Sequence, residues 1–251
     1  MPFTTAHIVA IIPFKKYTPN HLSISGMVIG TMVPDFEYFI RMTLYGHYGH
    51  TIGGIFFFDI PIGLILYLIF HAIVRQSTIV HLPNYLYFRV GSADNFDWSP
   101  YFKKNFFKIT LSIFIGVLTH FLWDGFTHDD EYYFAKYITI LILKINIFGR
   151  LIPLHFVLQM FSTVVGMIIL FWYIHKLPAK PKNQIKTDKQ IVNFWIFVLL
   201  LAIIIGVIRW SIGMPNEKIT GQLIVVSVSA SLLSLIIISF ISSKKMLTKF
   251  I

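Results

Sequence analysis

The stretch FFKITLSIFIGVLTHFLWDGFTH, residues 106–128, decides the fold of this chain. Its apolar part, Phe106–Trp123, approaches the length of about 20 residues that a helix needs to cross the hydrocarbon core of a bilayer. His120, Asp124 and His128 follow one another at every fourth position, so a helix places them along one face. The stretch therefore predicts a membrane-spanning helix that carries a polar stripe at its end.

Further apolar runs of similar length lie on both sides of this stretch. Four of them predict spanning helices, namely Ile52–Val74, Leu151–His175, Ile191–Ile212 and Gly221–Ile241. Leu22–Leu44 is a weaker candidate, because the charged residues Asp35, Glu37 and Arg41 interrupt it. Thr4–Phe14 is too short to span. The predicted fold is an all-α, polytopic transmembrane helical bundle, with about five or six spans plus a short N-terminal helix.

The composition agrees with a membrane protein. Of the 251 residues, 56% are hydrophobic and only 13% are charged, whereas soluble domains contain about twice that share of charge. The chain has no cysteine, which excludes disulfides and cysteine-ligated metal sites. The net charge of +10 comes from Lys and Arg residues that lie mostly between the apolar runs, as expected of loops beside anionic lipid. We expect membrane lipid as a partner and, without a nucleic-acid motif, no nucleic acid.

The distribution of Lys and Arg predicts the orientation. Most of the 21 basic residues fall in alternate loops, which the positive-inside rule places in the cytoplasm. The C-terminus is then cytoplasmic, and the loops 45–51 and 129–150 lie outside. We divide the chain into a His- and Asp-bearing membrane core (residues 1–130), an outer loop with a further span (131–175), and a basic linker with a two-helix tail (176–251).

Titratable residues are concentrated in the first 130 residues. A charged group within a spanning helix costs about 2.5–3.5 kcal/mol on insertion scales, so such groups usually face a protein interior, a partner or an ion. The last two helices contain only Arg209 as a comparable group. In the predicted orientation several titratable residues reach a similar depth near the outer face: Asp35, His50, Asp59, His120, Asp124 and His128. This coincidence predicts a site there.

Two interpretations compete for the residues on the helix 106–128. Imidazole nitrogens and carboxylate oxygens are ordinary zinc ligands at about 2.0–2.2 Å, and His120 and Asp124 are one turn apart. The alternative interpretation is a hydrogen bond between His120 and Asp124, which would satisfy two buried polar groups without a metal. Thr127 and His128 directly follow on the same helix.

The remaining polar motifs also leave alternatives open. Asp35 and Glu37 could share an ion, or stabilise a helix start through its dipole. His47 and His50 lie among glycines in a loop, which suits either a bent ligand loop or an interfacial one. Two residues stand alone in the sequence. A solitary histidine such as His7 is more often a core residue, and Asp59, close before Pro61, could settle a kink or support a ligand.

These motifs together resemble a known family. The order Thr-x-His7, Val-Pro-Asp35, His-x-x-His50-Thr51 and Gly116-x-x-x-His120-x-x-x-Asp124-x-x-Thr127 resembles the bacterial membrane-bound metal-dependent hydrolases, which are similar in turn to zinc-dependent phospholipase C. The longer text, from MPFTTAHIVAIIPFKK through LTHFLWDGFTH, is still more similar to an uncharacterised bacterial membrane family that is catalogued as a domain of unknown function. The chain departs from the hydrolase pattern at Glu37-Tyr38, where an Asp and a His are frequent, and at Tyr48-Gly49, where Arg-Gly is frequent.

The hydrolase resemblance covers about residues 1–130 and implies a ligand set. The implied metal ligands are His7, Asp35, His50, His120 and Asp124, with Glu37 and His47 as supporting or alternative ligands. The expected cofactor is zinc or another divalent metal, and the expected location is the bacterial cytoplasmic (inner) membrane, with the site near the outer face.

The expected function is that of a membrane-embedded, metal-dependent hydrolase acting on a lipid or lipid-linked ester or phosphoester. Asp35 and Asp124 would orient or deprotonate the attacking water, while Asp59, Thr127 and His128 would hold the ligands in place. One alternative is an ion- or proton-coupled transporter, in which the same groups form a path. The other is a metal-stabilised membrane protein without catalysis.

Overall fold

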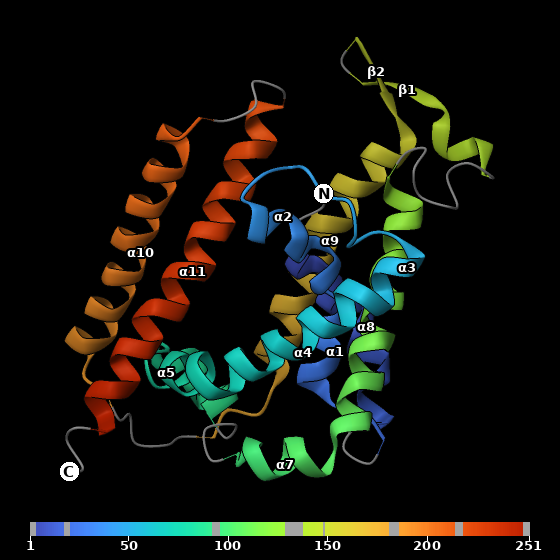
Figure 1. Cartoon of the computed structure of the whole chain (residues 1–251). Coiled ribbons are helices and arrows are strands. Elements are labelled where there is room, and N and C mark those ends of the chain that lie inside the picture. Colours follow the sequence, from blue (N-terminus) through green and yellow to red (C-terminus); the bar gives the residue numbers. More distant parts are fainter. Residues whose placement is uncertain are drawn as a thin grey trace. The chain divides into compact units, whose positions relative to one another are not determined.

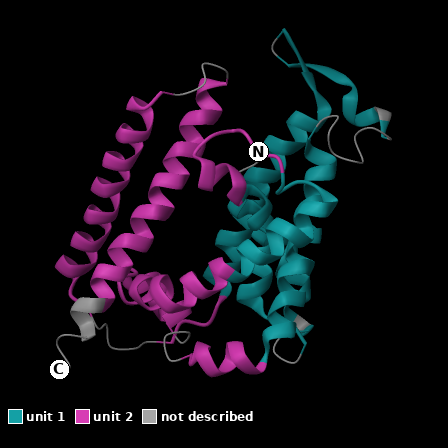
Figure 2. Ribbon diagram, in the orientation of Figure 1, with its two compact units in different colours: residues 1–35, 48–64, 105–176 teal, residues 36–47, 65–104, 177–251 magenta. Residues whose placement is uncertain are grey.

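A computed structural model describes residues 4–17, 21–91, 96–128, 138–147, 149–180, 186–213 and 218–247. The regular elements among these residues are helices, apart from one short hairpin (Figure 1). The chain forms two compact units (Figure 2). The first unit contains residues 1–35, 48–64 and 105–176, and the second contains residues 36–47, 65–104 and 177–251. Each unit therefore combines segments that are distant in the sequence.

Five helices among the described residues are long and apolar enough to cross a membrane. They are Ile52–Val80, Phe106–Thr127, Leu154–Lys176, Asp188–Ser211 and Ile219–Ser243. The first is a continuous series of turns, namely α3 (Ile52–Gly54), η3 (Ile55–Asp59), α4 (Ile60–Ile69), η4 (Phe70–Val74) and α5 (Arg75–Val80). The others are α8 (Phe106–Thr127), α9 (Leu154–Lys176), α10 (Asp188–Ser211) and α11 (Ile219–Leu247). These helices confirm five of the predicted spans and the all-α class.

The weaker candidate Leu22–Leu44 is wrong as a single helix. The segment is divided into α1 (Ile24–Gly30), η2 (Val33–Asp35) and α2 (Phe36–Arg41). Pro34 lies in the middle of the segment, where it cannot donate a backbone hydrogen bond. Met42 has a positive φ of 52° directly after α2, a conformation that ends a right-handed helix. The break leaves Asp35 in a short turn instead of on a spanning helix.

The N-terminal segment forms η1 (Thr4–Tyr17), a 3-10 helix, which confirms the expected short N-terminal helix. One other boundary differs from the prediction. The span that we expected to begin at Leu151 begins at Leu154, because residues before it form a hairpin of β1 (Lys144–Ile147) and β2 (Arg150–Pro153). Gly149 has a φ of +80° in the connection, which glycine adopts without a Cβ clash.

The first unit is organised around a close crossing of α1 and α8. A Cβ atom added to Gly116 would lie 2.4 Å from the carbonyl oxygen of Met27, and one added to Gly30 would lie 2.1 Å from that of Ile113. Small residues at helix crossings allow backbones to approach without intervening side chains. The Ser112 hydroxyl also accepts a hydrogen bond from the backbone N–H of Ser23, at 2.7 Å. This contact fixes the start of α1 against the first half of α8.

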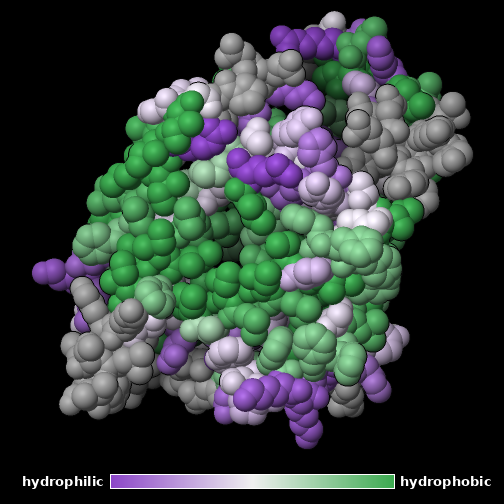
Figure 3. Space-filling model, in the orientation of Figure 1, coloured by the Kyte–Doolittle hydropathy of each residue, from purple (hydrophilic) through white to green (hydrophobic). Residues whose placement is uncertain are grey.

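In the second unit, α10 and α11 pack along each other. The hydroxyl of Ser234 on α11 donates to the carbonyl oxygen of Val198 on α10 at 2.6 Å. Thr187 and Gln190 form a capping box at the start of α10, which satisfies the first free N–H groups of that helix. Large apolar side chains of α10, such as Phe197 and Ile204, are exposed, and Figure 3 shows hydrophobic side chains over this helix. An exposed apolar helix face is suited to contact with lipid.

Three short helices complete the list of elements. The second unit contains α6 (Asn84–Val90) and α7 (Trp98–Lys104), and the first unit contains η6 (Thr139–Ile142).

Candidate metal centre

Five of the predicted site residues meet in the first unit. Their side chains come from four places in the chain, listed here with the element that carries each: His7 on η1, Asp35 on η2, His50 in the loop before α3, and His120 and Asp124 on α8. Among the described residues they form two groups that could hold a metal ion. In each group, one potential ligand atom per residue lies within 4.8 Å of the others.

The first group consists of His7, His120 and Asp124, all buried. The Nε2 atom of His7 lies 3.4 Å from Oδ1 of Asp124, and the Nε2 atom of His120 lies 3.1 Å from Oδ2. The two imidazole rings are stacked, with centroids 4.2 Å apart. Both histidines therefore face one carboxylate, His7 at Oδ1 and His120 at Oδ2.

The second group consists of Asp35, His50 and His120. The Nε2 atom of His50 lies 3.5 Å from Oδ1 of Asp35 and 3.4 Å from Nε2 of His120. It also lies 3.8 Å from Oδ2 of Asp124. His120 thus belongs to both groups, and the two groups form one continuous cluster.

The charge balance of the cluster favours a bound cation. Asp35 and Asp124 are 1% and 2% exposed, and their described ion pairs are all with histidines. Buried carboxylates need a compensating positive charge, which must come from protonated imidazoles or from an ion. The Oδ1 atom of Asp124 and both ring nitrogens of His7 are buried without a hydrogen-bond partner among the described residues. Buried polar atoms rarely remain unpaired unless something else binds them, so these residues fit a metal.

The protonation states of His7 and Asp35 suit metal binding. Burial, together with the neighbouring His120, lowers the pKa of His7 to about 3, so the ring is neutral and has a free lone pair. Burial acts to raise the pKa of Asp35, but the hydrogen bond from His50 and the adjacent His120 ring outweigh it and lower this pKa to about 2. A neutral imidazole and an ionised carboxylate are the forms that bind metals.

Two hydrogen bonds to residues outside the cluster orient His120 and Asp35. The Nδ1 atom of His120 lies 2.8 Å from the carbonyl oxygen of Thr31. A carbonyl only accepts, so Nδ1 of His120 carries a hydrogen, and Nε2 is the ring nitrogen that faces the cluster. The Thr4 hydroxyl donates to Oδ2 of Asp35 at 2.6 Å, which leaves Oδ1 directed towards His50. Such outer contacts commonly fix the orientation of metal ligands.

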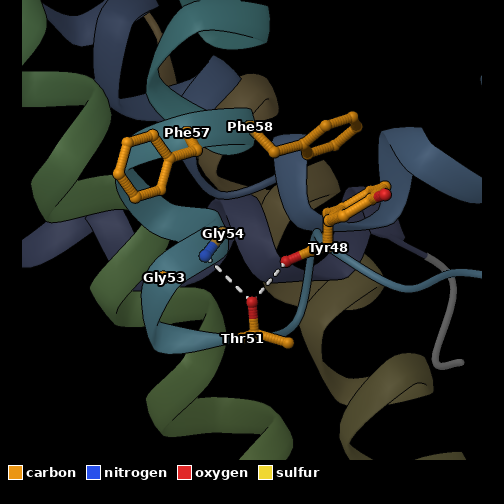
Figure 4. Close-up of a pocket in the computed structure, with 6 residues that line it drawn as sticks. All are labelled: Tyr48, Thr51, Gly53, Gly54, Phe57 and Phe58. Carbon is orange, nitrogen blue, oxygen red and sulfur yellow. Dashed lines mark hydrogen bonds between the residues drawn. The ribbon is translucent and has the colours of Figure 1, made fainter.

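The loop that carries His50 is locked at both ends. A Cβ atom on Gly49 would lie 2.3 Å from the carbonyl oxygen of Pro34, so only glycine lets this loop contact η2. The Thr51 hydroxyl donates to the carbonyl oxygen of Tyr48 and accepts from the N–H of Gly54, at 2.9 Å each (Figure 4). His50 is held between these two contacts.

A hollow of about 450 Å³ adjoins the His50 loop. It is lined by Tyr48, Thr51, Gly53, Gly54, Phe57 and Phe58 (Figure 4). The His50 side chain is 12% exposed, whereas the side chains of His7 and His120 are fully buried. His50 is thus the most exposed of these three histidines.

His128 extends the cluster at the end of α8. Its Nδ1 atom lies 3.6 Å from Oδ1 of Asp124 and 3.2 Å from the Thr127 hydroxyl oxygen. Its Nε2 atom lies 3.0 Å from the side-chain nitrogen of Gln159 on α9, which can only donate. Gln159 thereby sets the tautomer in which the Nδ1–H of His128 faces Asp124. The pKa of His128 is lowered, chiefly by burial.

Three other predicted residues lie elsewhere. Glu37 and His47 belong to the second unit, where Oε1 of Glu37 accepts from the backbone N–H of His47 at 2.8 Å and from Nε of Arg41 at 3.0 Å. Asp59 is fully buried at the end of the π-helical turn η3, and Pro61 follows within the same span. Neither of the two ligand groups contains these three residues. The π-helical turn is a local irregularity of the kind often found near functional sites.

The sequence analysis missed three residues that support the cluster, namely Thr4, Thr31 and Gln159. Thr4 and Thr31 act through contacts between segments far apart in the chain, which no sequence pattern marks. Gln159 did have a signal, because an amide inside an apolar spanning run is costly unless it has a partner. Its burial on α9, with His128 as partner, explains its presence there.

We predict that Gln159→Leu lowers the affinity of the cluster for a divalent metal without removing the site. His128 would lose the donor that orients it towards Asp124, and loss of an outer contact typically costs about 10–100-fold in metal affinity. The affinity would be measured by titration against a competing chelator. Gln222→Leu is the matched control, since Gln222 is also a buried glutamine but accepts from the N–H of Leu44 in the second unit. Equal affinities of the two variants would refute the role of Gln159.

The chain was compared with known proteins. A family model described as a domain of unknown function (DUF4184) matches residues 1–240. No curated protein and no solved structure matches the chain. The likeness to the metal-dependent hydrolases therefore stays an expectation.

Proposed function

The chain belongs to the family of the domain of unknown function DUF4184, and from its buried cluster we propose that it is a membrane-embedded, metal-dependent hydrolase. We propose zinc as the metal, held by His7, Asp35, His50, His120 and Asp124. The proposed substrate is a lipid or lipid-linked ester or phosphoester.

One observation carries the proposal. Two carboxylates and three imidazoles from four distant segments converge in the first unit. This unit contains apolar helices that are long enough to span a membrane. Burying such groups is costly, and their described partners are mainly one another. A ligand set of nitrogen and carboxylate oxygen without sulfur suits zinc, and a catalytic zinc site leaves a position for water or substrate.

The protein residues have separable tasks in this proposal. A zinc ion held there would supply a Lewis acid for an ester or phosphoryl oxygen. Asp35 has one oxygen engaged by Thr4 and the other near His50, so its Oδ1 atom can accept a hydrogen bond from the attacking water and orient it. Asp124 has imidazoles at both oxygens and holds His7 and His120 in place, with His128 steadied by Gln159 behind it.

The surroundings of the cluster support a lipid-type substrate. Two helices of the first unit, α8 and α9, are candidate spans, and α8 itself carries His120 and Asp124. A substrate that diffuses within the bilayer can approach a site on such a helix without leaving the membrane. A position in the outer leaflet region follows from the predicted orientation of the basic loops.

The test is a zinc-dependent hydrolysis assay on purified protein in detergent. We expect about one or two zinc ions per chain and release of phosphate from a set of phosphate-bearing lipids that stops on chelation and returns with zinc. Asp35→Asn should abolish turnover, whereas Arg209→Gln, which changes a residue of the second unit, should not. Carefully prepared protein without bound metal would refute the proposal. Hydrolysis by metal-free protein would contradict the mechanism, and zinc binding without hydrolysis of any lipid ester would identify a non-catalytic metal protein.

A further inference from the structure

A second cavity of about 470 Å³ lies in the first unit, between α8 and α9 and over η1. We refer to it as the α8–α9 groove. Its walls include Leu122 and Phe126 from α8 and Phe161 from α9, all exposed, and its floor includes Ala10 and Phe14 of η1. The volume lies in the range of about 300–1,000 Å³ that is usual for small-molecule sites.

The polar side chains that line the groove are already hydrogen-bonded within the protein, so the groove offers a ligand mainly apolar surface. Its hydroxyls donate to backbone carbonyls of their own helices: Thr119 to Gly116, Thr127 to Trp123, and Ser162 to Gln159. The indole N–H of Trp123 donates to the Ser162 hydroxyl across the groove at 3.3 Å. Polar groups that are already paired require nothing from a ligand. The lining therefore suits an alkyl chain better than a polar molecule.

The groove borders the candidate metal centre through two of its lining residues, Trp123 and Thr127. The ring of Trp123 lies 5.6 Å from the ring of His7, centroid to centroid. Thr127 lines the groove and contacts His128, which contacts Asp124. A chain lying in the groove would thus have one end beside the metal ligands.

We propose that the α8–α9 groove binds the acyl chain of a membrane lipid whose anionic phosphate head group lies at the metal centre. Both walls are candidate spans, so the groove opens towards the hydrocarbon of the bilayer and a lipid tail enters without crossing water. The inference rests on the proposed function and specifies its substrate class, namely a phospholipid held by its tail as well as by its head group.

Trp123 is a built-in reporter for this proposal. In a variant whose other tryptophans, Trp98, Trp172, Trp195 and Trp210, are changed to Phe, fluorescence reports the groove wall. The protein would be placed in phosphatidylcholine vesicles that contain either brominated phosphatidic acid or brominated phosphatidylcholine, with bromine on the acyl chain. With zinc bound, we expect brominated phosphatidic acid to quench Trp123 at several-fold lower mole fraction, and the preference to vanish on chelation.

Groove variants complete the test. Ala10→Phe fills the floor and should abolish the preference, while Leu118→Phe, on α8 but outside the lining, should preserve it. If Ala10→Phe does not fold, Phe161→Ala at an exposed wall position should reduce the preference several-fold. Equal quenching by both lipids with zinc bound would overturn this inference alone, and so would a Trp123 shielded from both, as expected if a partner helix fills the groove. Absence of bound zinc would instead overturn the proposed function.

Discussion

His120→Ala is expected to have the largest effect on zinc binding, because both ligand groups share His120 and the ion loses this imidazole whichever group holds it. His7→Ala should disrupt only the group around Asp124, and His50→Ala only the group around Asp35. We expect His120→Ala to lower zinc affinity beyond the about 10–100-fold that loss of a supporting contact costs. The measurement is zinc content per chain together with affinity against a competing chelator.

The matched control is His155→Ala. His155 is a buried histidine of the same unit, and its Nδ1 atom lies 3.3 Å from the carbonyl oxygen of Leu141, outside both ligand groups. The His155→Ala variant tests whether removing any buried imidazole of this unit lowers the zinc content. Equal zinc loss in His155→Ala and His120→Ala would contradict a specific role for His120. Equal loss in His7→Ala, His50→Ala and His120→Ala would favour a single ion bound by all of them over two overlapping groups.

The spanning helices were predictable because membrane insertion depends on a local property. An apolar run of about 20 residues satisfies its own backbone groups as a helix, and no distant contact is needed to decide it. Leu22–Leu44 shows the limit of this reasoning. Most of its residues are apolar, but Pro34 and the positive φ of Met42 divide the segment into short helices. Hydropathy averages over such single residues, so it suggested a span where the chain turns.

The ligands were predictable to different degrees. His120 and Asp124 lie one turn apart on α8, a relation that helix geometry alone provides. His7, Asp35 and His50 meet them only through tertiary contacts, and their grouping was expected from similar depth and from resemblance. Glu37 and Asp35 are two positions apart, yet Glu37 contacts Arg41 and His47 in the second unit. Nearness in the sequence could not separate these two residues, because η2 ends at Asp35 in the first unit and α2, which carries Glu37, belongs to the second.

Gly116→Val is expected to destabilise the fold of the first unit strongly, because it overpacks the crossing of α1 and α8. A Cβ atom at Gly116 would lie 2.4 Å from the carbonyl oxygen of Met27 and 2.7 Å from the Cα atom of Gly30. Both are backbone atoms, which cannot move aside as a flexible side chain can. Overpacking of this kind costs about 1–3 kcal/mol and occasionally more, and we expect at least the upper end here. The measurement is thermal unfolding in detergent.

The same change should also disturb the metal centre, because α1 and α8 hold it jointly. His120 lies one turn beyond Gly116 on α8, and its Nδ1 atom bonds to Thr31, the residue that follows Gly30 at the end of α1. Separating the helices would break that hydrogen bond and release the imidazole, so zinc affinity should fall together with stability. Gly206→Val on α10 is the control, since a Cβ atom there meets nothing within 4 Å. A Gly116→Val protein as stable as the Gly206→Val protein, with full zinc affinity, would show that the crossing of α1 and α8 does not position His120.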